Sequence, residues 1–273
     1  MRHRLKAALV LAAATISALG FIASVCTAGT PADASLGWDT TSTGPRRFLA
    51  VHGRRALIAG YSNNGLEVWA YPFQIVNRLG VGFRPAGTTT ETDGLSVLRR
   101  ITYNPESVTR TYIGPDYVIR EKLLVPLDLP AAILSYEVDS RSPVDVVIHF
   151  TPVLNLMWPA SIGGQETTWR PELSGYVISE PTQQFSAIIY SPNIIAHDDT
   201  ANVTQQLTPV RLEELSFTLR AGVGHNVTVI IAEGTPKDRN AASLASRVLA
   251  GAAALEGEAA NHYSSILNEN IRI

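Results

Sequence analysis

The sequence has little cysteine, few aromatic residues and no excess of charge of one sign. A single cysteine among 273 residues excludes an internal disulfide and any cysteine-based zinc cluster. Its 22 lysines and arginines against 24 aspartates and glutamates give a net charge of -2, and no basic run is visible. A chain without a basic excess offers little to a phosphate backbone, so we expect no nucleic-acid partner.

The common catalytic motifs are absent as well. There is no Gly-x-Ser-x-Gly elbow, no His-Glu-x-x-His zinc helix and no phosphate loop. Gly80-Val81-Gly82 comes closest to the Gly-x-Gly-x-x-Gly motif of dinucleotide-binding proteins, but Pro85 stands in the place of its third glycine. His197-Asp198-Asp199 could supply metal ligands, but adjacent polar residues after a strand are typical of a solvated turn. No carboxylate pair with the spacing of a glycosidase can be selected from the sequence. We therefore assign no metal, no cofactor and no catalytic residue.

The N-terminal segment has the pattern of an export signal. Residues Met1–Lys6 are basic, Ala7–Cys26 form an apolar run, and Ala32-Asp33-Ala34 supplies the small residues that a signal peptidase recognises. We predict a signal peptide over residues 1–34, export to the periplasm or the medium, and no stable membrane association after cleavage. The alternative is an uncleaved anchor, since about 20 apolar residues can just span a bilayer.

Most of the remaining chain is predicted to be β-structure. The segments 131–138, 144–150, 212–219 and 225–231 are rich in β-branched residues or alternate apolar and polar positions, with Leu215, Phe217 and Leu219 on one face. Turn residues such as Asn63-Asn64-Gly65 separate the runs, and no long helical stripe interrupts them. Because so many strands must bury their apolar faces, the sequence predicts an all-β domain at 35–234, a large antiparallel sandwich.

The pattern changes to a helical one over residues 235–273. Thr235 can cap free backbone N–H groups, Pro236 suits the first turn and Asp238 favours the positive end of the helix dipole. Leu244, Val248, Leu255 and Ile266 fall near one stripe of the predicted helix, and Gly251 is a place where it could divide into two. We expect the stripe to pack partly on the sandwich and to leave some apolar surface exposed.

Two aromatic segments are candidates for contact with a ligand. The segment Glu67–Phe73 places rings on both faces of a strand, and we expect Trp69 and Phe73 to lie in the core. The segment 156–169 carries Trp158, a Gly-Gly-Gln turn with Gln165, and Trp169. Two indole rings, backbone access at glycine and one amide can form a sugar subsite, since aromatic faces stack on pyranose rings. The alternative is a purely structural role.

Several of these residues resemble one known family. The order Gly65-Leu66-Glu67-Val68-Trp69-Ala70-Tyr71-Pro72, followed by Met157-Trp158-Pro159-Ala160 and Gly163-Gly164-Gln165, resembles bacterial glycogen-debranching (amylo-α-1,6-glucosidase-like) proteins. The resemblance extends from Phe48 to Ile273. It implies an N-terminal β-supersandwich joined by a helical linker to an (α/α)6 catalytic barrel. The family's general acid and base lie in the barrel, so the resemblance transfers no catalytic residue to this chain.

The sequence thus predicts a non-catalytic, exported sandwich domain of a debranching-type glycosidase. Its expected partners are the catalytic barrel and an α-glucan oligosaccharide, contacted through Trp158, Gln165 and Trp169. We expect no hydrolysis by this chain alone. Two alternatives stay open at this point: a freestanding secreted carbohydrate-binding module, and a complete small hydrolase whose carboxylate pair the sequence does not reveal.

Overall fold

A computed structural model of the chain describes residues 37–41, 46–157, 164–182, 184–199, 202–205, 214–234 and 240–270. The predicted signal peptide at 1–34 and the predicted helix start at Thr235 lie outside these residues, so both stay predictions, as do the domain boundaries. In the part that is described, no helix combines the length and the hydrophobicity needed to cross a membrane.

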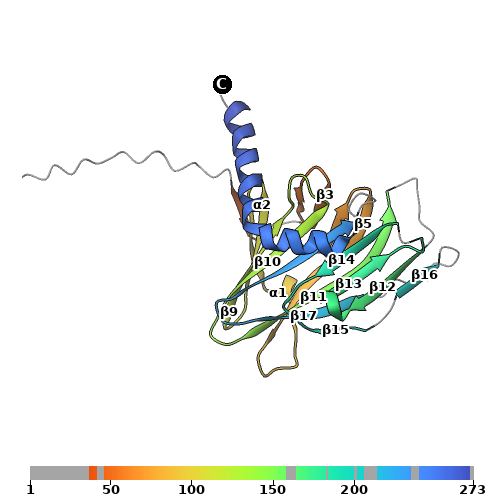
Figure 1. Ribbon diagram of the computed structural model, residues 1–273. Coiled ribbons are helices and arrows are strands. Elements are labelled where there is room, and N and C mark those ends of the chain that lie inside the picture. Colours follow the sequence, from red (N-terminus) through yellow and green to blue (C-terminus); the bar gives the residue numbers. More distant parts are fainter. Residues whose placement is uncertain are drawn as a thin grey trace, which may run out of the picture. The chain divides into compact units, whose positions relative to one another are not determined.

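The described strands form two sheets, and every pairing between neighbouring strands is antiparallel (Figure 1). One apolar core with residues from both sheets fills the space between them. The predicted all-β antiparallel sandwich with a C-terminal helix is therefore confirmed.

The larger sheet has ten described strands in the order β1-β7-β8-β9-β10-β18-β14-β13-β12-β16. Their bounds are β1 (Trp38–Thr41), β7 (Leu98–Tyr103), β8 (Ser107–Ile113), β9 (Tyr117–Leu124), β10 (Ala131–Ser140), β12 (Gly164–Arg170), β13 (Gly175–Ser179), β14 (Ser186–Tyr190), β16 (Asn202–Gln205) and β18 (Asn226–Gly234).

The smaller sheet follows the order β15-β17-β11-β5-β4-β3-β2, with β6 paired to β5 beside this path. Its strands are β2 (Phe48–His52), β3 (Ala56–Tyr61), β4 (Leu66–Ala70), β5 (Phe73–Pro85), β6 (Thr92–Asp93), β11 (Val144–Leu156), β15 (Ile194–His197) and β17 (Leu215–Ala221).

Strand alternation explains where the core lies. On β17, Leu215, Phe217 and Leu219 are buried between the sheets, as the sequence predicts. The central strands β10 and β18 are buried on both faces, because their other side packs against the C-terminal helix. This double burial accounts for the nearly continuous apolar runs in these two segments.

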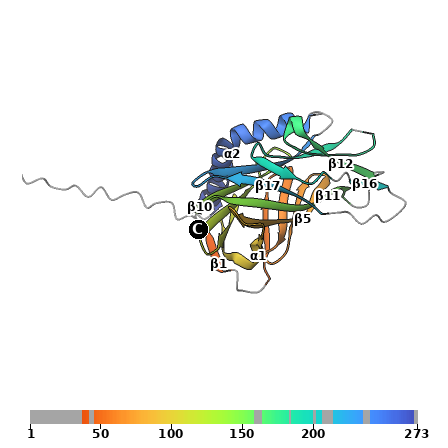
Figure 2. The same cartoon turned by 90° about the horizontal axis from the view of Figure 1, so that it is seen from below.

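The C-terminal helix α2 (Ala241–Asn270) lies on the outer face of the larger sheet. Its N-terminal half buries Leu244 and Val248 against β10, β14 and β18. Figures 1 and 2 show that the helix then bends. Beyond the bend it stays in contact with the sandwich as far as Tyr263, since Ala259 is fully buried and the Tyr263 hydroxyl donates to the His52 carbonyl at 3.0 Å. The helix contains Gly251 and Gly257 but is continuous through both, so the division into two helices suggested by the sequence is not present.

The apolar stripe of α2 is buried at one end and exposed at the other. Leu244 and Val248 are fully buried, Leu255 is half-buried, and Ile266 is 39% exposed. This gradient matches the expected arrangement, in which part of the stripe packs on the sandwich and part leaves apolar surface.

We expect Leu244→Ala to lower the free energy of unfolding by about 2–3 kcal/mol, because it removes buried methyl groups and leaves a cavity. The matched change Ile266→Ala, on the exposed part of the same helix, should cost about 0.5 kcal/mol or less. Urea denaturation followed by circular dichroism measures both values. Equal costs at the two positions would contradict the packing described for α2.

Two short helical turns occur among the described strands, where the sequence suggests none. The helix α1 (Gly94–Val97) follows Asp93, whose side chain accepts a hydrogen bond from the Leu95 backbone N–H. A single turn of 3₁₀ helix, η1 (Pro171–Leu173), links β12 to β13. Neither turn has the length of a packing helix, so both act as strand connections.

Candidate functional site

The structure describes two of the three residues predicted to contact a sugar, Gln165 and Trp169. Trp158 lies outside the described residues. Gln165 on β12 is 6% exposed, and its side-chain amide bonds to β11: Oε1 accepts from the Leu154 N–H at 2.6 Å and Nε2 donates to the Pro152 carbonyl at 2.9 Å. Its amide therefore links the two sheets, and a role in sugar binding stays a prediction.

Trp169 lies at the edge of the core, where β12 and β15 approach each other. Its ring stacks on His197 with the ring centroids 3.8 Å apart, and meets Tyr176 edge-on at 5.2 Å. The indole is partly buried and packs against the main core. Contact of Trp169 with a sugar is likewise still a prediction.

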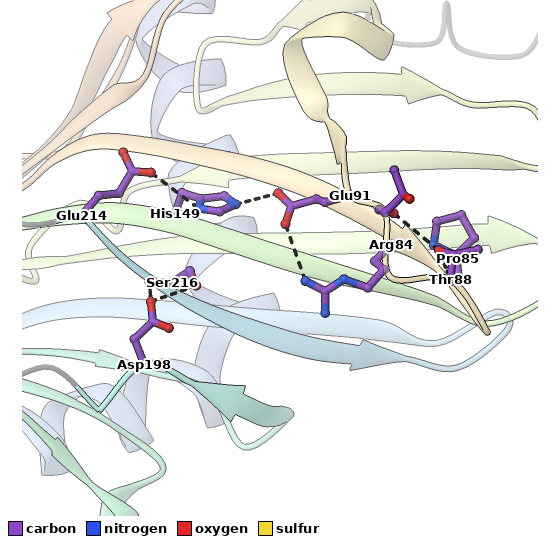
Figure 3. Close-up of polar contacts among 9 residues, drawn as sticks. Arg84, Pro85, Thr88, Glu91, His149, Asp198, Glu214 and Ser216 are labelled. Atoms are coloured by element: carbon purple, nitrogen blue, oxygen red, sulfur yellow. Dashed lines mark hydrogen bonds and ion pairs between the residues drawn. The ribbon is translucent and has the colours of Figure 1, made fainter.

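A polar cluster that the sequence analysis does not identify lies on the outer face of the smaller sheet (Figure 3). His149 on β11 stands between two carboxylates: Nε2 is 2.6 Å from Oε1 of Glu91, and Nδ1 is 3.7 Å from Oε1 of Glu214. The other Glu91 oxygen is 3.6 Å from the Arg84 guanidinium. All four side chains are partly exposed, which leaves the carboxylates free to accept further hydrogen bonds.

The turn between β5 and β6 carries Glu91 back over its own sheet. Thr88 Oγ1 donates to the Pro85 carbonyl at 2.8 Å, which closes this turn. The Glu91 carboxylate lies directly over Gly82, where a Cβ atom would collide with it. Gly80 and Gly82 belong to strand β5 and do not form a phosphate-binding loop.

A second set of contacts fixes the neighbouring strand. Ser216 on β17 is paired with His149 on one side, and both its N–H and its hydroxyl donate to Oδ2 of Asp198, at 2.7 and 3.0 Å (Figure 3). The Tyr176 hydroxyl donates to the Asp198 carbonyl at 2.7 Å. Asp198 thus anchors the end of β15 to β17, as a structural residue.

The segment that contains Trp69 differs in part from the expectation. Phe73 is fully buried in the core, as predicted, but Trp69 lies on the outer face of β4 and is half-buried. Its Nε1 donates to Oε2 of Glu67 at 3.0 Å. The period of two along a strand explains this result, since Leu66, Val68 and Ala70 face the core and the residues between them do not.

A charged network is buried inside the sandwich, on neighbouring strands of the larger sheet. Glu121 on β9 accepts hydrogen bonds from Arg110 Nε, from the Tyr112 hydroxyl at 2.7 Å and from the Tyr136 hydroxyl at 2.8 Å. None of the four side chains is more than 2% exposed. Burial raises the pKa of both tyrosines, so their hydroxyls keep their protons and donate.

Arg110 keeps its charge within this network. Burial lowers its pKa, but the adjacent Glu121 carboxylate more than offsets this effect, so that the pKa of Arg110 is raised. Its second terminal nitrogen, Nη2, is buried without a hydrogen-bond partner. Because the network is closed to solvent, we interpret it as structural.

Glu233, near the end of β18, is a second buried carboxylate and is 1% exposed. Unlike Glu121, it has an oxygen, Oε2, without a hydrogen-bond partner. Burial raises the pKa of Glu233 to about 8, against a smaller lowering by Arg55. At neutral pH this side chain is therefore mostly protonated in the folded protein.

A pocket of about 450 Å³ lies between α2 and the larger sheet. Two ion pairs cross or border it, Lys122 with Glu256 at 2.6 Å and Arg120 with Glu137 at 3.4 Å. Its cations are therefore paired within the protein. The pocket is lined by Thr109, Arg120, Lys122, Leu124, Ile133, Ser135, Glu137, Asn226, Ala252, Ala253 and Glu256.

Within the described ranges, no group of three or more histidine, cysteine, aspartate or glutamate side chains is arranged to hold a metal ion. His197 and Asp199 from the candidate metal triplet do make a contact, at 3.0 Å between Nδ1 and Oδ1. Asp198 instead turns to Ser216, so the three side chains do not converge.

Comparison with known proteins finds a likeness in structure and none in sequence. No protein-family profile matches the sequence, and no curated protein matches it. A bacterial glucoamylase in complex with acarbose superimposes with a TM-score of 0.52 at 10% identity, over 85% of this chain and 40% of the glucoamylase. At this identity the likeness shows a shared fold. This chain therefore corresponds in length to less than half of that enzyme.

Two further solved structures resemble the chain more distantly. A putative aldose 1-epimerase from Escherichia coli K12 gives a TM-score of 0.44 at 6% identity, over 70% of this chain and 100% of the epimerase. An α-N-acetylgalactosaminidase from Bifidobacterium bifidum gives 0.33 at 7% identity, over 69% of this chain and 36% of that enzyme. Neither score is high enough to carry an argument.

Proposed function

We propose that this chain is the β-sandwich domain of an exported debranching-type α-glycosidase. In this proposal the domain packs on an (α/α)6 catalytic barrel, forms one wall of the glucan-binding cleft and supplies no catalytic residue. The observation that carries the proposal is the fold shared with the glucoamylase, which spans 85% of this chain but only 40% of that enzyme. This proportion is expected for one domain of a larger glycosidase.

The C-terminal helix supports the same proposal. The helix packs on the small core beneath it as far as Tyr263, whose hydroxyl donates to the His52 carbonyl, whereas beyond this point Ile266 is 39% exposed. A helix anchored at one end and partly apolar at the other is suited to lead to a further domain, which would cover the exposed positions.

The proposal is tested by titrating the purified chain with maltooligosaccharides while following tryptophan fluorescence and the release of reducing sugar. We expect weak binding with a Kd near 1 mM, equivalent to about 4 kcal/mol, and no product. Trp158→Ala and Trp169→Ala should weaken binding, because each removes a stacking surface. Trp38→Ala is the matched control, since Trp38 is exposed on the edge strand β1 and stacks on Tyr103.

Each outcome has a definite meaning. Release of glucose or maltose by the chain would favour a complete small hydrolase and contradict the proposal. Identical responses from the wild type and both tryptophan variants would leave the 158–169 segment with a structural role only.

A further inference from the structure

The pocket between α2 and the larger sheet has no part in the function proposed above. Its volume of about 450 Å³ lies within the range of small-molecule sites in proteins. Its floor is formed by neighbouring positions on the outer face of the sheet, and α2 borders it with Ala252 and Ala253. Because both helix residues are small, they leave a space that longer side chains would fill.

The floor of the pocket changes from charged to apolar along the strands. Arg120 and Glu137 are paired across β9 and β10 at one end, and Leu124 and Ile133 are paired across the same strands at the other. Leu124 and Ile133 are buried and belong to the small core beneath α2. Four residues of an antiparallel strand span about 14 Å, which is the distance between the two ends.

The charged end holds polar groups that the protein leaves without hydrogen bonds. Arg120 Nη1 lies 3.4 Å from Glu137 Oε1, but within the described part of the chain neither side chain makes a hydrogen bond. The same holds, among the described residues, for the side chains of Thr109 and Asn226 beside them. Arg120 and Glu137 are 43% and 58% exposed, and an exposed ion pair contributes little to stability. A ligand can therefore come between them at little cost.

The charges of the pocket select for a ligand that carries both signs. An anion alone is repelled by Glu137 and a cation alone by Arg120, whereas a zwitterion can pair with both. The hydrogen-bonded pair of Lys122 and Glu256, at 2.6 Å, adds one further charge of each sign, so the lining has two cations and two carboxylates. The apolar end calls for an aliphatic group, which is removed from water there.

We propose that this pocket binds an α-amino acid with an aliphatic side chain. Its carboxylate pairs with Arg120, through the two parallel hydrogen bonds that a guanidinium can donate. Its ammonium group donates to Glu137, and its side chain lies toward Leu124 and Ile133. The inference goes beyond the proposed function and does not depend on it, because the pocket is formed by this chain alone.

The test uses the purified chain and three probes of equal chain length: 2-aminooctanoate, octanoate and octylamine. Isothermal titration calorimetry at neutral pH measures their binding. We expect 2-aminooctanoate to bind at least about tenfold more tightly than either of the other probes, since each of them lacks one of the two charged groups. Glu137→Gln should abolish the preference for 2-aminooctanoate over octanoate, because the ammonium group loses its charged partner.

Two substitutions in α2 test the place of binding. Ala253→Leu should fill the pocket and weaken the binding of 2-aminooctanoate at least about tenfold. Ala254→Leu is the matched control, because it introduces the same side chain at the next exposed helix position, which does not line the pocket. It should bind like the wild type. Leucine is favoured in helices, so neither variant should lower the melting temperature.

Equal binding of the three probes would overturn the choice of a zwitterion. Wild-type affinity in Ala253→Leu would show that binding occurs elsewhere, and a wild type that bound none of the probes would overturn the inference altogether. None of these measurements involves a maltooligosaccharide, so the proposed function is tested separately and can hold where this inference fails.

Discussion

Arg110→Met is expected to lower the free energy of unfolding by about 3–5 kcal/mol, because it leaves the Glu121 carboxylate buried without its counter-ion. Arg110 and Glu121 are 2% and 1% exposed, so water cannot replace the lost partner. The tyrosine hydroxyls of Tyr112 and Tyr136 still donate to Glu121, but they carry no compensating charge.

Urea denaturation monitored by tryptophan fluorescence measures the effect. The control is Arg120→Met on the same β-hairpin, whose guanidinium is 43% exposed and 3.4 Å from Glu137; this change should cost about 1 kcal/mol or less. The double variant Arg110→Met/Glu121→Leu should regain much of the loss, since the isolated charge is gone. A double variant as unstable as Arg110→Met would show that the buried pair itself is strongly favourable.

Glu233→Gln is expected to remove most of the loss of stability that the wild type shows between pH 4.5 and pH 8. The pKa of Glu233 is raised to about 8, so over this range the folded state binds more protons than the unfolded state. The free energy of unfolding therefore falls as the pH rises, by about 1.4 kcal/mol per unit and on the order of 5 kcal/mol in total. Glutamine is neutral at every pH and eliminates this contribution.

Melting temperatures from pH 4.5 to pH 9 test this prediction. Glu180→Gln is the control, because the pKa of Glu180 is lowered: burial raises it, but hydrogen bonds from Thr182, Gln184 and Phe185 outweigh that effect. The stabilisation that ionised Glu180 contributes is complete above the pKa of this group in the unfolded chain. It disappears only as the pH falls through the lower pKa of Glu180 in the folded protein. The Glu180→Gln variant should keep the alkaline slope, and a Glu233→Gln variant that also kept it would contradict the role of Glu233.

The sequence predicts the sandwich because its signals are local. Alternation on β17, the β-branched runs of β11 and β18, and turns such as Asn63-Asn64-Gly65 depend only on neighbouring residues, and the structure confirms them. Trp69 shows how such a signal can be misjudged. Its size suggests the core, whereas its position between Val68 and Ala70 places it on the other face.

The polar cluster depends on pairings between distant segments, which a single sequence does not reveal. His149 lies on β11, Glu91 in the β5–β6 turn and Glu214 directly before β17, and only the sheet order brings them together. A local signal did exist: His149 falls between Ile148 and Phe150, two core residues, which places it on the outer face of the strand. The partners of His149 could not be inferred from that pattern.

The edge strands of the larger sheet bear on the risk of strand pairing between molecules. The described sheet ends in β1 and β16, each four residues long, so that neither offers a long row of unpaired backbone groups to another molecule. Through its pairing from Trp38 with Tyr103 to Thr41 with Arg100, β1 covers most of the six-residue strand β7. Loss of β1 would expose that longer strand as a template for intermolecular β-pairing and for aggregation.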